Sequence, residues 1–347
     1  MRVLSVVGAR PQFIKLYSIQ KTCKLMEVEH IVVHTGQHYD FSMSEAFFVG
    51  LNIPTPDVNL GVGSGSHASQ TGQLLVPLSE TFEKYSPDWI FLYGDTNSTL
   101  AAAITASKEH FNIAHIEAGL RSFDKSMPEE INRICTDHLS DINFAPTISA
   151  MGNLKNEGLS DRSILVGDVM KDALTSTNFT GTSAKGNYLV LTLHRPSNVD
   201  DPERLKDIFE KLGATGERII LPVHPRLKNQ LLKISNFFLP SNIELIEPLP
   251  YVEMIEFVKS SLGVITDSGG LQKETYMLGK LCLTVRTTTE WVETLIDGRN
   301  QLDPKLEKLS LFLENCYNAR LSGDFLDSNT YGLGNASELI LSNILER

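Results

Sequence analysis

The chain has 347 residues and a formal net charge of −11, with 31 Lys and Arg against 42 Asp and Glu. Its length suits two domains, and its 41% hydrophobic and 21% charged residues are the balance of a folded globular protein. The acidic balance argues against a nucleic-acid partner, because phosphate backbones are bound by clustered Lys and Arg. No apolar run approaches the ~18 residues that a membrane span requires, so we expect no membrane segment.

The cysteines give no sign of a disulfide framework or a metal site. Cys23, Cys135, Cys282 and Cys316 lie far apart and form neither a CxxC motif nor a Cys/His spacing. The N-terminal segment has the pattern of a buried strand rather than of a signal peptide. We therefore expect reduced, mostly buried cysteines, a cytoplasmic protein and no metal ion.

Short apolar runs rich in Val and Ile alternate with segments of helical character along the first half of the chain. Continuous apolar runs are typical of parallel strands that helices bury on both faces. The strands expected here span residues 2–8, 30–36, 88–95, 113–119, 142–146 and 163–168. Each run ends in Gly, Asp or Pro where a helix should begin, so the sequence predicts a repeated βα unit.

The second half of the chain repeats this rhythm. Its expected strands span residues 187–194, 218–224, 243–248, 262–270 and 281–286. The fold class that this pattern predicts is α/β, with two Rossmann-like domains whose parallel sheets face a central cleft.

The domain boundaries follow from composition. Residues 175–186 are rich in Ser, Thr and Gly and are expected to form an exposed linker. The first domain is then residues 1–174 and the second residues 187–330. The last segment, 331–347, has the apolar spacing of an amphipathic helix, and we expect it to pack back on the first domain.

In open parallel sheets the ligand lies outside the carboxyl ends of the strands, so residues just after each strand are candidates for the site. The first strand is followed by Gly8, Arg10, Pro11 and Lys15. Two cations at the first turn of a helix suit a phosphate or a carboxylate, although they are also compatible with a solvated helix start. The segment is neither GxGxxG nor a Walker loop, so it lacks a dinucleotide or P-loop motif.

Acidic residues follow three later elements of the same half. Asp95 comes after one strand, and Glu117 ends the next, with His115 two residues earlier on the same expected strand face. Glu129 lies in the first turn of a helix that begins at Pro128. Taken singly, Asp95 is equally compatible with a helix cap and Glu129 with a partner of the helix dipole.

Together these carboxylates converge at the mouth of one predicted sheet. The basic residues expected beside them are Arg10, Lys15 and Arg133. Several carboxylates in one place are what the removal and return of a proton require.

The second half places His194 and His224 at strand ends, each followed closely by an Arg. Ser268, Gly269 and Gly270 stand where a helix should begin, so their backbone N–H groups can point at phosphate oxygens. These features favour an anionic ligand, although a lone His is more often structural.

Six motifs carry a family resemblance: GARPQFIK, GDTNSTLA, HIEAGLRSFD, MPEEINR, PVHPR and TDSGGLQKE. In this order they resemble the non-hydrolysing UDP-N-acetylglucosamine 2-epimerase family, from about residue 3 to the YGLGNAS segment at 331–337. The family has the two-domain GT-B fold.

The resemblance implies a role for each matched position. The catalytic residues that it implies are Asp95, Glu117, Glu129 and His194. It implies that Glu274 binds the ribose and that the uracil lies near Tyr251 and Met254. The full set expected to bind substrate is Arg10, Lys15, Arg133, His224, Tyr251, Met254, Ser268, Gly269, Gly270, Glu274 and Arg286.

The implied reaction interconverts UDP-N-acetylglucosamine and UDP-N-acetylmannosamine by elimination of UDP and its re-addition through a 2-acetamidoglucal. It needs no redox cofactor and no metal. The partner is the UDP-sugar, the product serves surface polysaccharide synthesis, and the family is usually homodimeric.

The sequence departs from well-known bacterial members in places. Residues 37–40 and 195–198 differ at positions that resemble the family's activating second site, and 289–293 read TEWVE where TERPE is common. This last change, together with GARPQFIK, favours a sibling branch that epimerises UDP-2,3-diacetamido-2,3-dideoxy-glucuronate. The sequence is also compatible with a hydrolysing epimerase and with a GT-B glycosyltransferase, although a glycosyltransferase has no need of three carboxylates.

Overall fold

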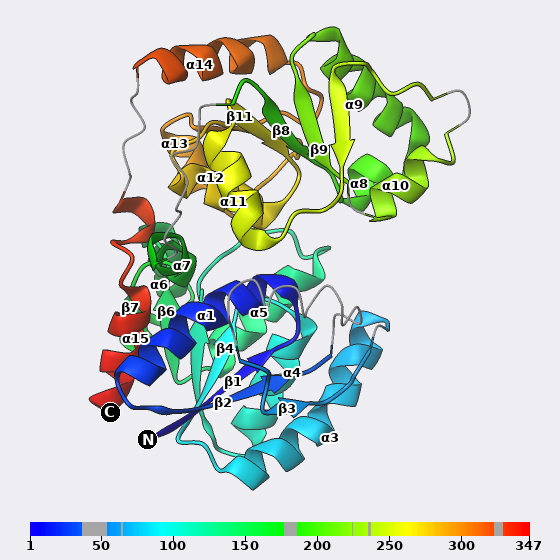
Figure 1. Cartoon of the computed structure of the whole chain (residues 1–347). Coiled ribbons are helices and arrows are strands. Elements are labelled where there is room, and N and C mark those ends of the chain that lie inside the picture. The colour runs from blue at the N-terminus through cyan, green and yellow to red at the C-terminus, as the bar shows by residue number, and fades with distance from the viewer. Residues whose placement is uncertain (37–53, 64, 177–185, 224, 235–236, 323–328) are drawn as a thin grey trace. The chain divides into compact units, whose positions relative to one another are not determined.

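The computed structural model describes residues 1–36, 54–63, 65–176, 186–223, 225–234, 237–322 and 329–347 (Figure 1). The chain divides into two compact units: Met1–Asn178 together with Asn329–Arg347, and Phe179–Ser328. Each unit has a parallel sheet flanked by helices, which confirms the predicted α/β fold class (Figure 1). Most of the expected linker at 175–186 lies outside the described residues.

The sheet of the first unit has seven described strands in the order β3-β2-β1-β4-β5-β6-β7. They are β1 (Arg2–Val7), β2 (Glu29–His34), β3 (Val58–Asn59), β4 (Trp89–Tyr93), β5 (Asn112–Ile116), β6 (Ile142–Ala145) and β7 (Ser163–Leu165). The helices are α1 (Arg10–Leu25), α3 (His67–Tyr85), α4 (Asn97–Lys108), α5 (Pro128–Leu139), α6 (Ile148–Asn156), α7 (Val169–Ser176) and α15 (Ala336–Leu345), with short 3₁₀ turns η1 (Ser160–Arg162) and η2 (Asn329–Tyr331). Every residue of β4 is buried, which explains its unbroken apolar sequence.

The sheet of the second unit has six described strands in the order β10-β9-β8-β11-β12-β13. They are β8 (Leu189–Thr192), β9 (Ile219–Pro222), β10 (Ile243–Ile246), β11 (Gly263–Thr266), β12 (Cys282–Thr284) and β13 (Asn300–Leu302). The helices are α8 (Pro196–Val199), α9 (Pro202–Ala214), α10 (Pro225–Leu231), α11 (Tyr251–Ser260), α12 (Gly269–Met277), α13 (Glu293–Ile296) and α14 (Leu309–Ser322). In both sheets the strand order reverses beside the first strand of the unit, β1 or β8, where Rossmann-like sheets place their ligands.

The edge strands follow the sequence pattern less closely than the central strands. β3 and β13 were not predicted, because two or three residues with polar members do not form an apolar run. β10 has two exposed residues, Glu244 and Leu245, since only one neighbour covers an edge strand. The expectation of burial on both faces therefore holds for the sheet centres and not for this edge.

The C-terminal helix α15 belongs to the first unit, where it packs against α1 and α7 (Figure 1). Its N-cap residue, Asn335, makes no side-chain cap. The carboxylate of Asp172, on α7, takes this part instead and accepts hydrogen bonds from the N–H groups of Ala336 at 3.0 Å and Ser337 at 2.7 Å. A buried carboxylate from a distant segment thus sets where α15 begins.

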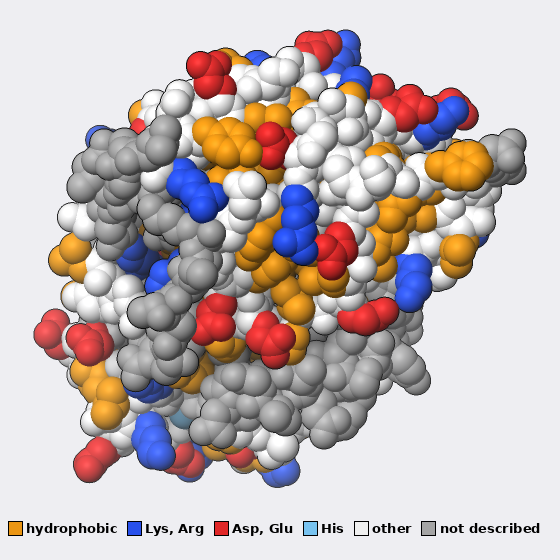
Figure 2. All heavy atoms as spheres, turned by 45° about the horizontal axis from the view of Figure 1, so that its top comes forward, with side chains coloured by type: hydrophobic (Ala, Val, Ile, Leu, Met, Phe, Trp, Pro, Cys, Tyr) orange, Lys and Arg blue, Asp and Glu red, His pale blue; other side chains and the backbone are white. Residues whose placement is uncertain are grey.

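The surface and the thiols fit a folded globular chain. All four cysteines are free, and burial raises the pKa of Cys23, Cys282 and Cys316 to about 12, which makes these thiols unreactive. On the face shown in Figure 2, Lys and Arg side chains are interspersed with Asp and Glu. Within the described residues, no helix combines the length and apolar character needed to cross a membrane.

Replacing Asp172 with Ala should lower the free energy of unfolding by about 1–3 kcal/mol, because two buried N–H groups of α15 lose their acceptor. Urea denaturation followed by circular dichroism measures the change. Glu80→Ala, which replaces an exposed acid within α3, is the control and should stay within about 0.5 kcal/mol of the wild type. Equal losses in the two variants would contradict the docking role of Asp172.

Candidate active site

The first turn of α1 is tied to the end of β4 by one buried amide. Gln12 Oε1 accepts hydrogen bonds from the N–H groups of Gly8 at 2.7 Å and Ala9 at 2.9 Å. Its Nε2 donates to the carbonyl oxygen of Tyr93 at 2.8 Å. The turn predicted to bind an anion is therefore held against the strand that leads to Asp95. The side chain of Arg10 lies outside the described residues, and its role stays a prediction.

Lys15 and Glu117 form a buried ion pair. Lys15 Nζ lies 2.5 Å from Glu117 Oε1, and the two residues are 5% and 8% exposed. Burial of either charge alone would cost several kcal/mol, so each group requires the other. Glu117 follows the last residue of β5 and has a φ of +72°, a conformation rare outside glycine. The expectation that His115 and Glu117 share a strand face is therefore wrong, because strand alternation ends at Ile116.

Gly94 allows this pair to sit at the end of β4. It has a φ of +61°, and a Cβ placed on it would stand 3.0 Å from Lys15 Nζ and 3.5 Å from Glu117 Oε1. A side chain here would displace the ammonium group. The backbone before Asp95 thus makes room for the neighbouring ion pair.

Asp95 forms the second ion pair of this site. Its Oδ2 accepts from the guanidinium of Arg133 at 2.5 Å, and its side chain remains 29% exposed. Desolvation raises the pKa of Asp95, and the negative charges of Glu117 and Glu129 act in the same direction. The cations Arg133 and Lys15 oppose this rise without cancelling it, so the pKa of Asp95 lies above its ordinary value. A carboxyl group with a raised pKa is suited to both releasing and taking up a proton.

The structure separates the two adjacent acids of α5. Glu130 is 1% exposed and accepts hydrogen bonds from the N–H groups of Ser122 at 2.8 Å and Phe123 at 2.9 Å. Burial would raise the pKa of Glu130, but these hydrogen bonds outweigh it and the pKa lies below its ordinary value. Glu130 therefore holds a loop. Glu129, the predicted residue, is only half-buried, and its charge acts on Asp95.

In the second unit, Asp267 holds the segment after β8. Asp267 is fully buried and accepts hydrogen bonds from the backbone N–H groups of His194 and Arg195, both at 3.0 Å. Asn198 Nδ2 donates to it at 3.1 Å, and Nδ1 of His194 lies 3.0 Å from Oδ1. A carboxylate can only accept, so the Nδ1 of His194 carries a proton in this contact. Nε2 is then the ring nitrogen that this imidazole, which is 45% exposed, can present to a ligand.

The N-terminus of α12 begins at the predicted Ser-Gly-Gly segment. Ser268 is its N-cap, and Ser268 Oγ accepts from the N–H of Leu271 at 3.3 Å. The N–H groups of Gly269 and Gly270 belong to the first turn, which has no acceptor within the helix. Glu274 lies one turn further along the same helix and is 7% exposed.

Three other residues of this unit that were predicted to bind substrate, Arg286, Tyr251 and Met254, lie away from the first turn of α12 in the chain. The guanidinium of Arg286 lies 3.0 Å from Glu290, so this cation is already paired. Tyr251 begins α11 and is buried, and Met254 on the same helix packs against an apolar cluster. His224 lies outside the described residues.

Sequence reasoning missed Gln12, Asn198 and Asp267 among the residues that position the site. All three lie inside the segments singled out above, but their amides and carboxylate point into the protein, which a residue type does not reveal. For Asp267 a signal existed, since an acid directly after a central strand can reach the neighbouring strand's end. Among the described residues, no three His, Cys, Asp or Glu side chains are arranged to hold a metal ion.

Two parallel sheets with these strand-end sites place the chain among two-domain α/β proteins of the GT-B type. The family model for UDP-N-acetylglucosamine 2-epimerase matches residues 21–345. The chain belongs to this family.

Relatives and solved structures agree with this assignment. The chain is 45% identical to a UDP-N-acetylglucosamine 2-epimerase homolog of Methanococcus maripaludis, over 98% of each chain. It is also 45% identical to the UDP-2,3-diacetamido-2,3-dideoxy-D-glucuronate 2-epimerase of Pseudomonas aeruginosa, over 87% of this chain and 88% of the relative. The crystal structure of the Methanocaldococcus jannaschii UDP-GlcNAc 2-epimerase in complex with UDP-GlcNAc and UDP matches with a TM-score of 0.87 at 37% identity, covering 100% of both chains.

Replacing Asp267 with Asn should make stability less dependent on pH on the acid side. Burial would raise the pKa of Asp267, but hydrogen bonds from His194, Asn198 and Arg195 hold it below its ordinary value. The ionised group therefore stabilises the fold above its unfolded pKa of about 4, and this stabilisation is lost as pH falls through the folded pKa.

Urea unfolding of wild type and variant, between about pH 7 and pH 3, measures this difference. The variant should be less stable at neutral pH, and the gap should shrink as the solution is acidified. A gap that is constant over this range would contradict the assignment.

Proposed function

We propose that this protein is a UDP-N-acetylglucosamine 2-epimerase that inverts C2 of the sugar. The observation that carries the proposal is the group at the end of the first sheet: three carboxylates, Asp95, Glu117 and Glu129, with two buried cations. Two proton carriers are needed because the proton leaves C2 from one face and returns to the other. Membership of the epimerase family supports this assignment.

In the proposed reaction one carboxylate removes the C2 proton while the bond between C1 and the diphosphate oxygen breaks. UDP leaves with the bonding electrons, and a C1–C2 double bond forms in a 2-acetamidoglucal. A second acid then protonates C2 on the opposite face, and UDP adds back to C1. Asp95, with its raised pKa, is suited to hold the returning proton.

The second unit supplies groups suited to the UDP part. The first-turn N–H groups of α12 favour a diphosphate, because a helix N-terminus carries partial positive charge. His194 offers Nε2 to the leaving oxygen, since Asp267 occupies Nδ1. We propose that Glu274 binds the ribose hydroxyls and that Tyr251 and Met254 lie beside the uracil.

A second candidate substrate is UDP-2,3-diacetamido-2,3-dideoxy-glucuronate. Two observations favour it. Trp291 and Val292 stand where Arg and Pro are common in the family, and the chain is 45% identical to the Pseudomonas aeruginosa enzyme named for that substrate. Both reactions are the same C2 inversion, so the site described above serves either. A glycosyltransferase has no use for the carboxylate group and is disfavoured.

We further propose that the enzyme acts in the cytoplasm as a homodimer, in keeping with its four free thiols and with the usual state of the family. Sedimentation equilibrium measures the mass directly. A species at the 38.5 kDa of one chain would contradict the dimer.

Proton NMR with each UDP-sugar tests the function. The purified protein should convert UDP-N-acetylglucosamine to a mixture that shows the anomeric signal of UDP-N-acetylmannosamine. Turnover of the diacetamido-uronate alone would move the assignment to the second candidate. If neither sugar is epimerised although UDP binds, the proposed function is wrong.

Glu117→Gln should abolish epimerisation, with kcat falling by at least about a hundredfold, because an amide cannot carry the C2 proton. The dissociation constant for UDP, measured by calorimetry, should stay nearly unchanged, since Glu117 lies in the first unit. Glu83→Gln, an exposed acid of α3, is the control. Wild-type turnover by the Glu117 variant would remove this residue from the mechanism.

Glu274→Ala should weaken UDP binding by about tenfold, because a charge-assisted hydrogen bond to ribose is lost. Calorimetric titration with UDP measures this effect, and Glu253→Ala on neighbouring α11 is an exposed control. An unchanged dissociation constant would sink the ribose assignment.

A further inference from the structure

A buried network lies directly behind the two turns that carry Asp95 and Glu117. Its centre is His115, on β5, which is completely buried and has no place in the proposed chemistry. His115 Nε2 lies 2.8 Å from the carbonyl oxygen of Gly94, the residue before Asp95. His115 itself stands two residues before Glu117, so one imidazole connects the ends of β4 and β5.

Asp137, on α5, holds the other side of this imidazole. Its Oδ1 lies 2.6 Å from His115 Nδ1, and its Oδ2 accepts from the N–H of Gly119 at 3.1 Å. Asp137 is also fully buried. The carboxylate therefore fixes the turn around Glu117 from both ends, through residue 115 before it and residue 119 after it.

The turn has little freedom to adopt this shape by itself. Glu117 has a φ of +72° and Gly119 a φ of +81°, and a Cβ on Gly119 would stand 2.5 Å from the carbonyl oxygen of Ala150. A strained non-glycine conformation persists only where the surroundings over-determine it. The hydrogen bonds of His115 and Asp137 provide that constraint.

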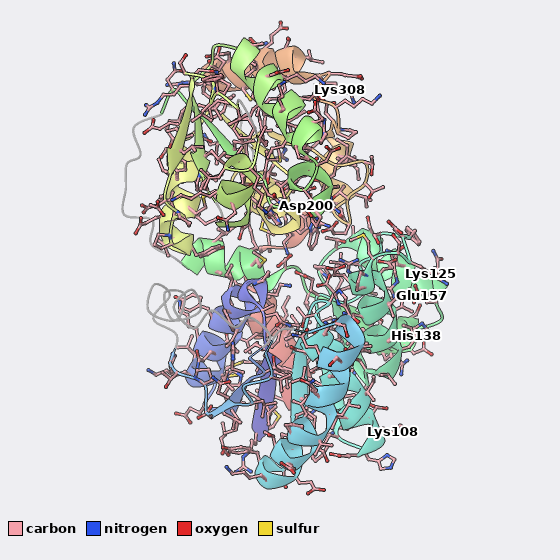
Figure 3. The ribbon with its side chains drawn as sticks, turned by 90° about the vertical axis from the view of Figure 1, so that its right-hand side faces the viewer. Lys108, Lys125, His138, Glu157, Asp200 and Lys308 are labelled. Carbon is pink, nitrogen blue, oxygen red and sulfur yellow. The ribbon has the colours of Figure 1, made fainter. Side chains whose placement is uncertain are left out.

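The outer part of the network balances its charge. Arg121 Nη1 lies 2.7 Å from Asp137 Oδ2, and its Nε and Nη2 donate to the two oxygens of Glu157 at 2.7 and 2.8 Å. Glu157 also lies 3.0 Å from Nε2 of the exposed His138, and Figure 3 shows these two side chains close together at the edge of the first unit. Burial would raise the pKa of Asp137, but His115 and Arg121 outweigh it and keep the carboxyl ionised.

The partners of His115 decide its protonation. A carbonyl oxygen and an ionised carboxylate can only accept hydrogen bonds, so both ring nitrogens must donate. Both attachments of the imidazole therefore depend on its ring N–H groups, and a ring that lacked one of them would lose that attachment.

We propose that His115, hydrogen-bonded to Asp137 on one side and to the Gly94 carbonyl on the other, is the positioning residue that fixes the distance between the turns bearing Asp95 and Glu117 during proton transfer. The inference rests on the proposed function of these two carboxylates. Buried charges are costly, and a protein that needed only a stable strand end would be served as well by apolar side chains. A fixed spacing of two proton carriers is what this network supplies beyond stability.

The test compares His115→Gln and Asp137→Asn with wild type, using the UDP-sugar that wild type turns over. Each variant should lower kcat by about ten- to a hundredfold, because misplaced proton carriers lose their alignment. KM and the dissociation constant for UDP should stay within about threefold, since neither variant replaces a residue expected to bind substrate. His30→Gln is the matched control: this half-buried histidine of β2 bonds the hydroxyl of Ser5 rather than a catalytic turn, and its kcat should be unchanged.

A second readout is independent of turnover. In the nitrogen NMR spectrum of histidine-labelled wild type, the signals that His115→Gln removes should show an attached proton on each ring nitrogen, as two donated hydrogen bonds require. A ring nitrogen of His115 without an attached proton would overturn the bridge. Variants that lose only thermal stability and keep wild-type kcat would overturn the positioning role.

The same experiments separate this inference from the proposed function. If wild type epimerises no UDP-sugar, the function fails and the positioning role fails with it, whatever the spectrum shows. If wild type is active and the variants retain kcat, only the positioning role fails.

Discussion

The structure depends on one electrostatic constraint: carboxylates gathered at the end of a buried parallel sheet must be offset by cations. Lys15 reaches Glu117 from α1, and Arg133 reaches Asp95 from α5, so a helix that precedes these strands and a helix that follows them close on the same two acids. The compensation is incomplete at Asp95, whose pKa stays raised. Burial also raises the pKa of Asp172, which docks α15, but Asp172 is buried whereas the side chain of Asp95 is 29% exposed. The raised pKa together with contact with solvent suits Asp95 to exchange a proton.

Several other buried acids hold backbone segments in place. Glu130, Asp137 and Asp267 accept several hydrogen bonds each, and their pKa values are lowered despite burial. Such carboxylates stay ionised and fix backbone, as Asp267 does for the segment of His194. In each unit a buried acid holds a turn that carries a candidate site residue. Asp137 holds the turn of Glu117 in the first unit, and Asp267 holds the segment of His194 in the second.

Much of this arrangement could be predicted from the sequence. Central strands such as β4 are indicated by unbroken apolar runs, and Asp95, Glu117 and Glu129 follow from their places after strands and at a helix start. Two-residue β3 has no such signal, because edge pairing depends on backbone and not on residue type. Gln12, Asp137 and Asp267 were missed because hydrogen bonds between segments far apart in the chain decide their roles. The left-handed turn at Glu117 is set by tertiary contacts, which no local pattern contains.

The most direct test of the account is hydrogen exchange at C2 during turnover in D2O. Wild-type protein with UDP-N-acetylglucosamine, or with the diacetamido-uronate if that is the substrate, should lose the C2 proton signal as deuterium enters both epimers. This outcome requires that the C2–H bond breaks at a group in contact with solvent protons, as the partly exposed Asp95 is. Epimerisation with the C2 proton retained would contradict the carboxylate mechanism at its centre.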